Sequence, residues 1–255
     1  MKEVIKFNLK GISGIFKKSD SNTTYFTYNN IHKIALLGII GSIIGENGYN
    51  YNSLFKDKQN KLPDFYNSLK NLKVGIKPNA NNIFTKKIQS FNNSVGYASK
   101  EDGNNLIVSE QWIENPSWDI YILKDDSPQY KKLKEYLIDK KCEYIPYIGK
   151  NDHFANINDV KILDASILNN VIKIDSIFKE IDYTIVDDMV DIIYGFDTKK
   201  EIKYEYKEVL PISLDSKIGY TDFKEFVYTN NEININNKSD INDIYEIDKD
   251  NIYFF

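Results

Sequence analysis

A chain of 255 residues with 42% hydrophobic content can hold one large domain or two small ones around a real core. Its single cysteine, Cys142, excludes an internal disulfide framework and suits a reducing cytoplasm. The longest apolar run, 34–45, has 12 residues, whereas a membrane-spanning helix needs about 20. Because the N-terminus is charged and strand-like rather than a signal peptide, we expect a soluble cytoplasmic protein with no membrane partner.

Charge is divided unevenly along the chain, although the net charge is only −4. Residues 1–100 carry 15 lysines and five acids, a net charge of +10, whereas residues 101–255 carry 18 lysines and 32 acids, a net charge of −14. All 33 basic residues are lysine. A coding bias toward lysine and asparagine explains the missing arginine but not the segregation of charge. The basic half predicts a localised surface for a polyanion.

Hydrophobic periodicity predicts the order of the elements. Residues 3–10 alternate as a half-buried strand, 11–30 form a polar loop, and 31–45 have helical spacing. Glycines on one stripe of that helix cost about 1 kcal/mol each relative to alanine, and their expected gain is close approach to a sheet. Further elements are expected at 72–77, 106–113, 118–123, 127–140 (a helix with an N-cap serine followed by proline) and 154–160. The order β-α-β-β-α-β is that of a ferredoxin-like unit.

Two regions fall outside this unit. Residues from about 78 to 105 are polar and too long for a structureless loop in a compact domain, so they predict a functional excursion or a hairpin. Residues 168–255 contain short β-like runs in an acidic setting. We therefore expect an α+β fold with a ferredoxin-like domain, 1–167, and a small acidic β-rich C-terminal region, 168–255.

The segment 7–45 resembles the opening of the Cas-five family, the RAMP-type subunits of type I CRISPR surveillance complexes. That family begins with a strand ending in glycine, a phenylalanine before basic residues, a Thr/Ser-rich turn and a Gly-Leu-Leu-Gly-like helix. The matching residues are Gly11, Phe16-Lys17-Lys18, Asn22-Thr23-Thr24, Thr27-Tyr28 and Gly38-Ile39-Ile40-Gly41. Where the family often has Pro-Pro-Arg-Thr, this chain has Asn30-Ile31-His32-Lys33. Lys33 keeps the charge but not the bidentate fork of arginine.

The resemblance extends over residues 3–165. Residues 111–121 resemble the family's strand–Asn-Pro–strand segment, 144–151 its Pro-x-Leu-Gly-Lys-Ser loop, and 154–160 its Ala-x-Ile-x-x-Val strand. It implies a non-catalytic, I-B-like subunit of the antiviral Cascade complex that grips the 5′ handle of the CRISPR RNA. The excursion at 78–105 would be a thumb against the backbone (Cas-seven-type) subunit, and the large (Cas-eight-type) subunit would dock on another face. No cofactor is implied.

Lysines and aromatic rings around the polar loop suit a single RNA strand, because rings stack on bases while ammonium groups hold phosphates. The alternative is a solvated loop with core aromatics. The turn at 149–151 offers backbone N–H groups and a lysine to a phosphate, or is an ordinary turn. With the resemblance, the residues expected to contact RNA are Lys10, Ser13, Phe16, Lys17, Lys18, Asn22, Thr24, Tyr28, His32, Lys33, Lys86, Lys87, Gly149, Lys150, Asn151 and His153.

Catalysis is the competing interpretation. With a single cysteine, His32 and His153 make a poor metal set, but either can act as a general acid or base in metal-independent RNA cleavage. The type I-C branch of the family cleaves precursor RNA with a Tyr, Lys and His set, and this chain lacks the Lys-His pair. Acid pairs such as Asp125-Asp126 and Asp187-Asp188 are interpreted as solvated rather than metal-binding. The alternatives are therefore an endoribonuclease that makes the guide RNA and a general RNA-binding module.

Overall fold

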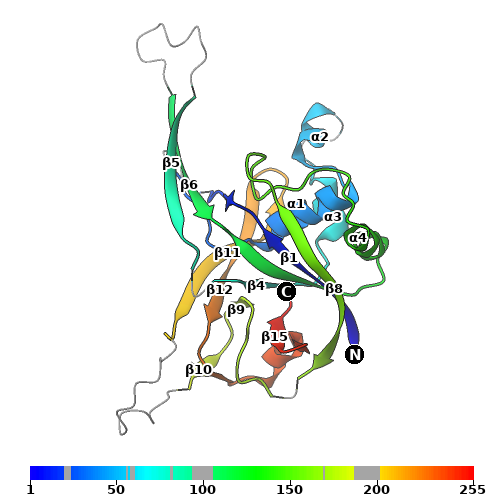
Figure 1. Ribbon diagram of the computed structural model, residues 1–255, viewed down its shortest axis with the longest axis vertical. Coiled ribbons are helices and arrows are strands. Elements are labelled where there is room, and N and C mark those ends of the chain that lie inside the picture. Colours follow the sequence, from blue (N-terminus) through cyan, green and yellow to red (C-terminus); the bar gives the residue numbers. More distant parts are fainter. Residues whose placement is uncertain are drawn as a thin grey trace, which may run out of the picture.

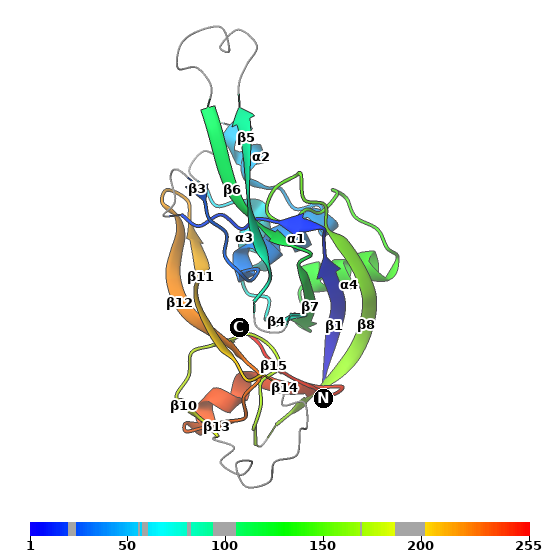
Figure 2. The ribbon, with the colours of Figure 1, turned by 60° about the vertical axis from the view of Figure 1, so that its left-hand side comes forward.

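The computed structural model describes residues 1–19, 24–55, 57, 61–80, 83–93, 106–168, 170–186 and 202–255. The fold is strand-rich α+β, with helices against one face of a sheet and a long hairpin projecting from the body (Figures 1 and 2). No helix in these ranges is long and apolar enough to cross a bilayer.

The body is built on a six-stranded sheet in which each pair of neighbouring strands is antiparallel. Its lateral order is β15-β14-β8-β1-β7-β4. These strands are β1 (Lys2–Lys10), β4 (Val74–Pro78), β7 (Ser117–Leu123), β8 (Asn156–Ile167), β14 (Ile244–Ile247) and β15 (Asp250–Tyr253). The helices are α1 (Lys33–Ile44), α2 (Tyr49–Leu54), α3 (Asp64–Leu69) and α4 (Pro128–Ile138). The elements β1, α1, β4, β7, α4 and β8 occur along the chain in the predicted order, whereas the strand predicted at 106–113 belongs to another sheet.

The glycines of α1 allow close packing, but against a different partner from the one predicted. A Cβ atom on Gly41 would lie 2.6 Å from Cβ of Phe65, a residue of α3. The glycine spacing had predicted close approach to a sheet, and that prediction was wrong. The reason is that α1 presents its long apolar side chains, such as Leu37 and Ile40, to the core, which leaves the small-residue stripe for the neighbouring helix.

Residues 86–93 of the excursion predicted near 78–105 form one strand of a hairpin. Strand β5 (Lys86–Asn93) pairs antiparallel with β6 (Leu106–Glu114) from Lys86↔Ile113 to Asn93↔Leu106. Two short strands, β2 (Ser13–Gly14) and β3 (Thr24–Tyr25), also pair with β6. Residues 94–105 lie outside the described residues. The hairpin therefore borders the polar loop, which brings β6 side chains to the loop.

The C-terminal region supplies strands to the body as well as its own sheets. It contains β9 (Phe178–Lys179), β10 (Tyr183–Ile185), β11 (Glu205–Asp215), β12 (Gly219–Thr229), β13 (Ile233–Ile235) and the 3₁₀ helix η3 (Lys238–Asp243). Strands β14 and β15 extend the main sheet beyond β8, and Phe255 exchanges two 3.1 Å backbone hydrogen bonds with Val74. The regions 1–167 and 168–255 thus share one sheet, and their division into separate domains stays a prediction.

The two faces of the main sheet are covered differently. On one face, Ile5, Phe7 and Leu9 of β1 are fully buried in the cluster that contains the α1 side chains. On the other face, Val4 and Tyr121 pack in a second cluster with residues of the C-terminal hairpin, Ile247, Ile252 and Phe254. The alternation predicted for residues 3–10 is therefore confirmed, and both sides of β1 are partly buried.

Candidate nucleic-acid interface

The described residues of the polar loop, 11–19 and 24–30, form two segments that hydrogen-bond to each other, and we call them the arch. The Lys18 N–H donates to the carbonyl of Phe26 at 2.8 Å, and the Tyr28 N–H donates to the carbonyl of Phe16 at 2.9 Å. In this part of the loop Ile15 and Phe16 are buried, whereas Lys17 is exposed and Lys18 is half-buried. This fixes which of the predicted RNA contacts can face solvent.

Two predicted stacking residues are part of the core instead. Phe16 is 3% exposed and Tyr28 is 4% exposed. The Phe16 ring lies 5.9 Å from the ring of Trp118, and the Tyr28 ring lies 5.5 Å from that of His32, measured between centroids. Because neither ring presents a free face, the structure corrects the prediction that they stack on bases.

His32 is the N-cap of α1. Its Nδ1 accepts a 3.3 Å hydrogen bond from the Ala35 N–H, so the imidazole is neutral. Complete burial lowers the pKa of His32 from 6.5 to about 3. The ring also meets the ring of Tyr220 edge-on at 5.0 Å. These contacts give His32 a structural role at the base of the interface.

Lys33 points away from the loop it was predicted to serve. Its ammonium donates to the carbonyl of Phe255 at 3.0 Å. Burial, with a smaller repulsion from Lys73, lowers the pKa of Lys33 to about 8. Lys33 therefore contacts Phe255, which follows β15, rather than a surface for RNA, and this corrects the sequence-based assignment.

The buried carboxylate of Glu208, on β11, fixes the end of the polar loop. It accepts hydrogen bonds from the backbone N–H groups of Asn29, at 2.7 Å, and Asn30, at 3.1 Å. Burial raises the pKa of Glu208, while these two N–H groups and the charges of Lys86 and Lys18 oppose the rise. A residue of the acidic region thus positions the basic loop.

The turn predicted to cradle a phosphate is tightly packed against the arch. Gly149 has φ +82°, and a Cβ atom there would lie only 1.7 Å from the carbonyl oxygen of Ile15. Its N–H donates to the carbonyl of Tyr147, and the Ile148 N–H donates to that of His153. Since these donors are used within the turn, glycine serves close approach here rather than phosphate binding.

Lys150 is held at the surface by a buried acid. Its ammonium lies 3.1 and 3.3 Å from the two carboxylate oxygens of Glu110, which also accepts the indole N–H of Trp112 at 2.9 Å. Desolvation lowers the pKa of Lys150, but the hydrogen bonds and charge of Glu110 and Asp152 outweigh it and the pKa is raised. Lys150 is therefore a fixed cation.

His153 is buried beside this ion pair. Its Nδ1 shares a 2.7 Å hydrogen bond with the hydroxyl of Ser13, and the Trp112 ring meets the imidazole edge-on at 4.7 Å. Within the described structure its Nε2 is buried without a partner. Burial, partly offset by Asp152 and Glu110, lowers the pKa of His153. Ser13 and His153 thus brace the arch against the turn, beneath the surface.

A groove of about 800 Å³ is lined in part by the arch and by the turn that contains Gly149 and Lys150. One wall is formed by α1, α2 and the residues between them, and the other by the arch and the segment 144–150. We call it the tyrosine groove. Its lining includes the tyrosines Tyr25, Tyr49, Tyr51, Tyr144, Tyr147 and Tyr220 and the lysines Lys17 and Lys150.

Rings and cations in the tyrosine groove are accessible. Tyr49, Tyr144 and Tyr147 are each about half exposed, between 45% and 56%. The Lys17 ammonium lies 3.6 Å from the centroid of the Tyr25 ring. Exposed aromatic faces beside lysine ammonium groups suit a flexible polyanion with planar groups, which describes single-stranded nucleic acid.

The other predicted contact residues are spread over the molecule. Lys18 lies over the Tyr28 ring, Lys87 pairs with Glu114 at 3.1 Å, and burial lowers the pKa of Lys86 at the base of the hairpin. Lys10 is exposed at the end of β1, Thr24 belongs to β3, and Asn151 is exposed in the turn. Asn22 lies outside the described residues. Of the predicted lysines, the groove brings together Lys17 and Lys150.

Apart from Tyr25, a ring of the polar loop, the tyrosines of the groove were not predicted from the sequence as RNA contacts, and neither was Glu110. The signals present were Tyr49 and Tyr51 after the first helix, and Tyr144 and Tyr147 shortly before Gly149. Nothing local in the sequence shows that these segments face each other. In the described ranges, no three His, Cys, Asp or Glu residues gather as a metal site.

No protein-family model and no curated protein matches this sequence. Solved structures with a similar arrangement include a CRISPR protein from Archaeoglobus fulgidus, with 12% identity, a TM-score of 0.49 and 98% of each chain covered. Another is a chain of a CRISPR RNA-guided surveillance complex, with 11% identity, a TM-score of 0.48, and 89% of this chain and 90% of that chain covered. With TM-scores below 0.5, these similarities do not assign the chain to a family.

Proposed function

We propose that this chain is an RNA-binding subunit of a type I, I-B-like CRISPR surveillance complex, and that the tyrosine groove holds the 5′ handle of the CRISPR RNA. The observation that carries this proposal is the convergence of Lys17, Lys150 and exposed tyrosines on one groove. The type of complex and the 5′ handle are inferred from the sequence resemblance to the Cas-five family. The matched residues include Gly11, directly after β1, and Gly38 and Gly41 on α1.

The groove combines the two interactions that single-stranded RNA needs. Bases stack on Tyr49, Tyr144 or Tyr147, each stack contributing about 1–3 kcal/mol. Phosphates lie against Lys17 and Lys150. The ammonium of Lys150 is held in place by the carboxylates of Glu110, at 3.1 Å, and Asp152, at 3.5 Å, with which a phosphate shares it. Binding of this kind depends on shape and charge and tolerates different base sequences.

The rest of the proposal follows the same resemblance. We take β8-β1-β7-β4 with α1 and α4 as a ferredoxin-like unit, because four antiparallel strands and two helices follow one another in the β-α-β-β-α-β order. The β5–β6 hairpin then serves as the thumb that contacts the backbone subunit. The large subunit docks on another face of the body.

We propose further that the chain is not a ribonuclease. General acid–base cleavage needs an accessible group that titrates near neutral pH, whereas His32 caps a helix in the neutral form and His153 is buried. The purified protein should leave a precursor RNA containing its own CRISPR repeat intact. Site-specific cleavage that disappears in His153→Ala would instead support the endoribonuclease alternative.

A stacking experiment tests the groove directly. Tyr144→Leu/Tyr147→Leu removes two exposed rings while keeping side chains of similar apolar character. We expect binding of single-stranded RNA to weaken at least tenfold, since each stack removed is worth about 1–3 kcal/mol. The matched control, Phe223→Leu, changes an exposed ring of β12 outside the groove. Equal affinity of the two variants in a fluorescence anisotropy titration would refute the groove as the RNA site.

A further inference from the structure

The sheet face opposite α1 has one half that is covered by apolar side chains and one half that is polar. The half of this face near the start of β1 is covered, because Val4 and Tyr121 pack against Ile252 and Phe254. Toward the end of β1 the same face becomes polar. Asn8 and Asp119 there are only partly buried, and Lys10 is exposed.

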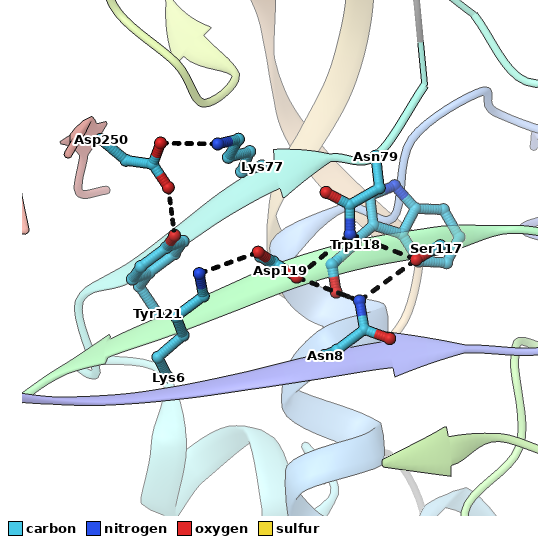
Figure 3. A network of polar contacts seen from close by, with 9 residues as sticks. All are labelled: Lys6, Asn8, Lys77, Asn79, Ser117, Trp118, Asp119, Tyr121 and Asp250. Atoms are coloured by element: carbon cyan, nitrogen blue, oxygen red, sulfur yellow. Dashed lines mark hydrogen bonds and ion pairs between the residues drawn. The ribbon is translucent and has the colours of Figure 1, made fainter. Parts of the chain in front are cut away.

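Hydrogen bonds hold this polar half rigid (Figure 3). The Asp119 carboxylate accepts from the amides of Asn8, at 3.0 Å, and Asn79, at 3.1 Å, and pairs with Lys6 at 2.9 Å. Both amides also donate to the hydroxyl of Ser117. Within the described structure, the amide oxygens of Asn8 and Asn79 accept no hydrogen bond, so two fixed acceptors remain.

The strand register places unpaired cations beside this network. Lys10 lies opposite Asn156, and Lys6 lies opposite Lys161. Lys10, Asn156, Asn158 and Lys161 are all exposed. In the described part of the chain, neither Lys10 nor Lys161 forms an ion pair.

The acids of this face leave its charge positive. Asp119 is paired with Lys6, and Asp250 is paired with Lys77 at 2.6 Å. Asp159, in the bulge of β8, is exposed and has no ion pair within the described residues. A positive, amide-rich surface of this kind matches the phosphates and hydroxyls of a nucleic-acid strand.

Phe154 connects the segment that lines the tyrosine groove with the end of β1. Tyr147, which lines the groove, pairs with Phe154 in a β-bridge. A Cβ atom on Gly11 would lie 3.0 Å from the carbonyl of Phe154, and Gly11 follows Lys10 directly. Phe154 is 65% exposed. The exposed ring of Phe154 therefore lies between the groove and the end of β1.

We propose that RNA leaving the tyrosine groove passes over Phe154 and continues on the open sheet face along Lys10, Asn156, Asn158 and Lys161, a path we call the sheet track. This inference rests on the proposed RNA binding by the groove. The two lysines hold phosphates, while the asparagine amides contact sugar hydroxyls or base edges. A strand too short to leave the groove would not reach the track.

Oligonucleotide length separates the two sites. Single-stranded RNAs of about 5 and about 15 nucleotides, within the range that single-strand-binding folds occupy, are titrated over a salt series. For Lys10→Gln/Lys161→Gln, we expect unchanged affinity for the short RNA. With the long RNA, the salt slope should be flatter by about 1.4, because each of the two phosphates that is no longer neutralised accounts for about 0.7. Asp159→Asn, which suits the left-handed backbone of the bulge, should tighten only the long RNA.

Controls distinguish failure of the track from failure of the groove. Lys224→Gln/Lys249→Gln removes the same charge from exposed positions of β12 and the β14–β15 turn and should change neither titration. If Lys10→Gln/Lys161→Gln binds the long RNA like the wild type, while Lys17→Gln/Lys150→Gln weakens both lengths, the sheet track is refuted and the groove stands. If the groove variant changes neither length, both proposals fall. Thermal unfolding of each variant verifies that it is folded.

Discussion

Gly149 is the residue on which the wall of the tyrosine groove depends most directly. Gly149→Ala would place a methyl group against the Ile15 carbonyl and strain a backbone with φ +82°. We expect the free energy of unfolding to fall by more than about 2 kcal/mol, because the backbones themselves must separate.

Gly219 provides the matched control for that substitution. It has φ +84° but no atom within 4 Å of its expected Cβ, so Gly219→Ala should cost only the left-handed strain of about 1–2 kcal/mol. Urea denaturation measures both variants. Equal decreases in the two would show that the close approach of Gly149 to Ile15 contributes nothing beyond backbone strain.

The buried His32 at the start of α1 makes the stability of the protein depend on pH. Its pKa in the folded protein is about 3, below the ordinary 6.5. Between these values the unfolded chain binds a proton that the folded chain does not, so stability falls as the pH is lowered from 6.5 toward 3.

A substitution at the cap isolates this effect. His32→Asn keeps a side-chain acceptor at the N-cap but removes the titrating group. We expect a shallower pH dependence of the unfolding free energy than in the wild type, and His32→Ala should lose about 1 kcal/mol further at neutral pH. If the unfolding free energy of the wild type and of His32→Asn changed with pH in the same way, His32 would not be buried in the neutral form.

The sequence predicted residue types better than residue environments. Lysines of the basic half were expected to bind RNA, and Lys17 of that half does share one groove with Lys150. Phe16 and Tyr28 were misplaced because a loop lacks the periodicity that separates core from surface. An aromatic ring beside a lysine occurs both in the groove, as Tyr25 with Lys17, and in the core, as Tyr28 with Lys18.

At the scale of elements, the β5–β6 hairpin separates into a base and an arm. At the base, Phe84 is buried, its ring lies 5.1 Å from that of Trp118, and its N–H donates to Asn29. The arm continues outward from the pair Ser90↔Ser109. Only the arm is free to serve as a thumb without supporting the core.

Removing the arm tests that division. Replacing residues 91–108 by a short Gly/Ser turn should leave the body folded, with a melting temperature within a few degrees of the wild type, yet prevent assembly with backbone subunits. Phe84→Ala, by contrast, should cost about 3–5 kcal/mol of stability. Normal assembly of the shortened protein, measured by size-exclusion chromatography, would show that the arm is not the thumb.

Local signals predicted the elements well. Ser127 caps α4 by accepting the Tyr130 N–H at 3.1 Å, and proline occupies its first turn, as the sequence indicated. The predicted strand at 154–160 was too short, because β8 continues to Ile167 beyond a bulge at Asp159. A bulge shifts the alternation by one residue and hides the second half of a strand from pattern analysis.

At the scale of the whole molecule, the position of the last two strands could not be predicted. Pairing between Tyr245 and Ile167 joins residues far apart in sequence, and nothing local encodes it. The consequence is that residues 1–167 expressed alone should be unstable, since Val4 and Tyr121 would lose their apolar cover and Val74 its partner Phe255. A cooperative unfolding transition of that fragment would restore the two-domain division.

RNA binding across a salt series tests the central claim most directly. Lys17→Gln/Lys150→Gln removes two groove charges while glutamine still offers Glu110 a donor; Lys224→Gln/Lys249→Gln removes two charges elsewhere. For single-stranded RNA we expect weaker binding and a slope flatter by about 1.4 in the groove variant, at about 0.7 per phosphate, and wild-type values in the control. If both variants show the same affinity and the same slope, the tyrosine groove does not bind the RNA and the account is wrong.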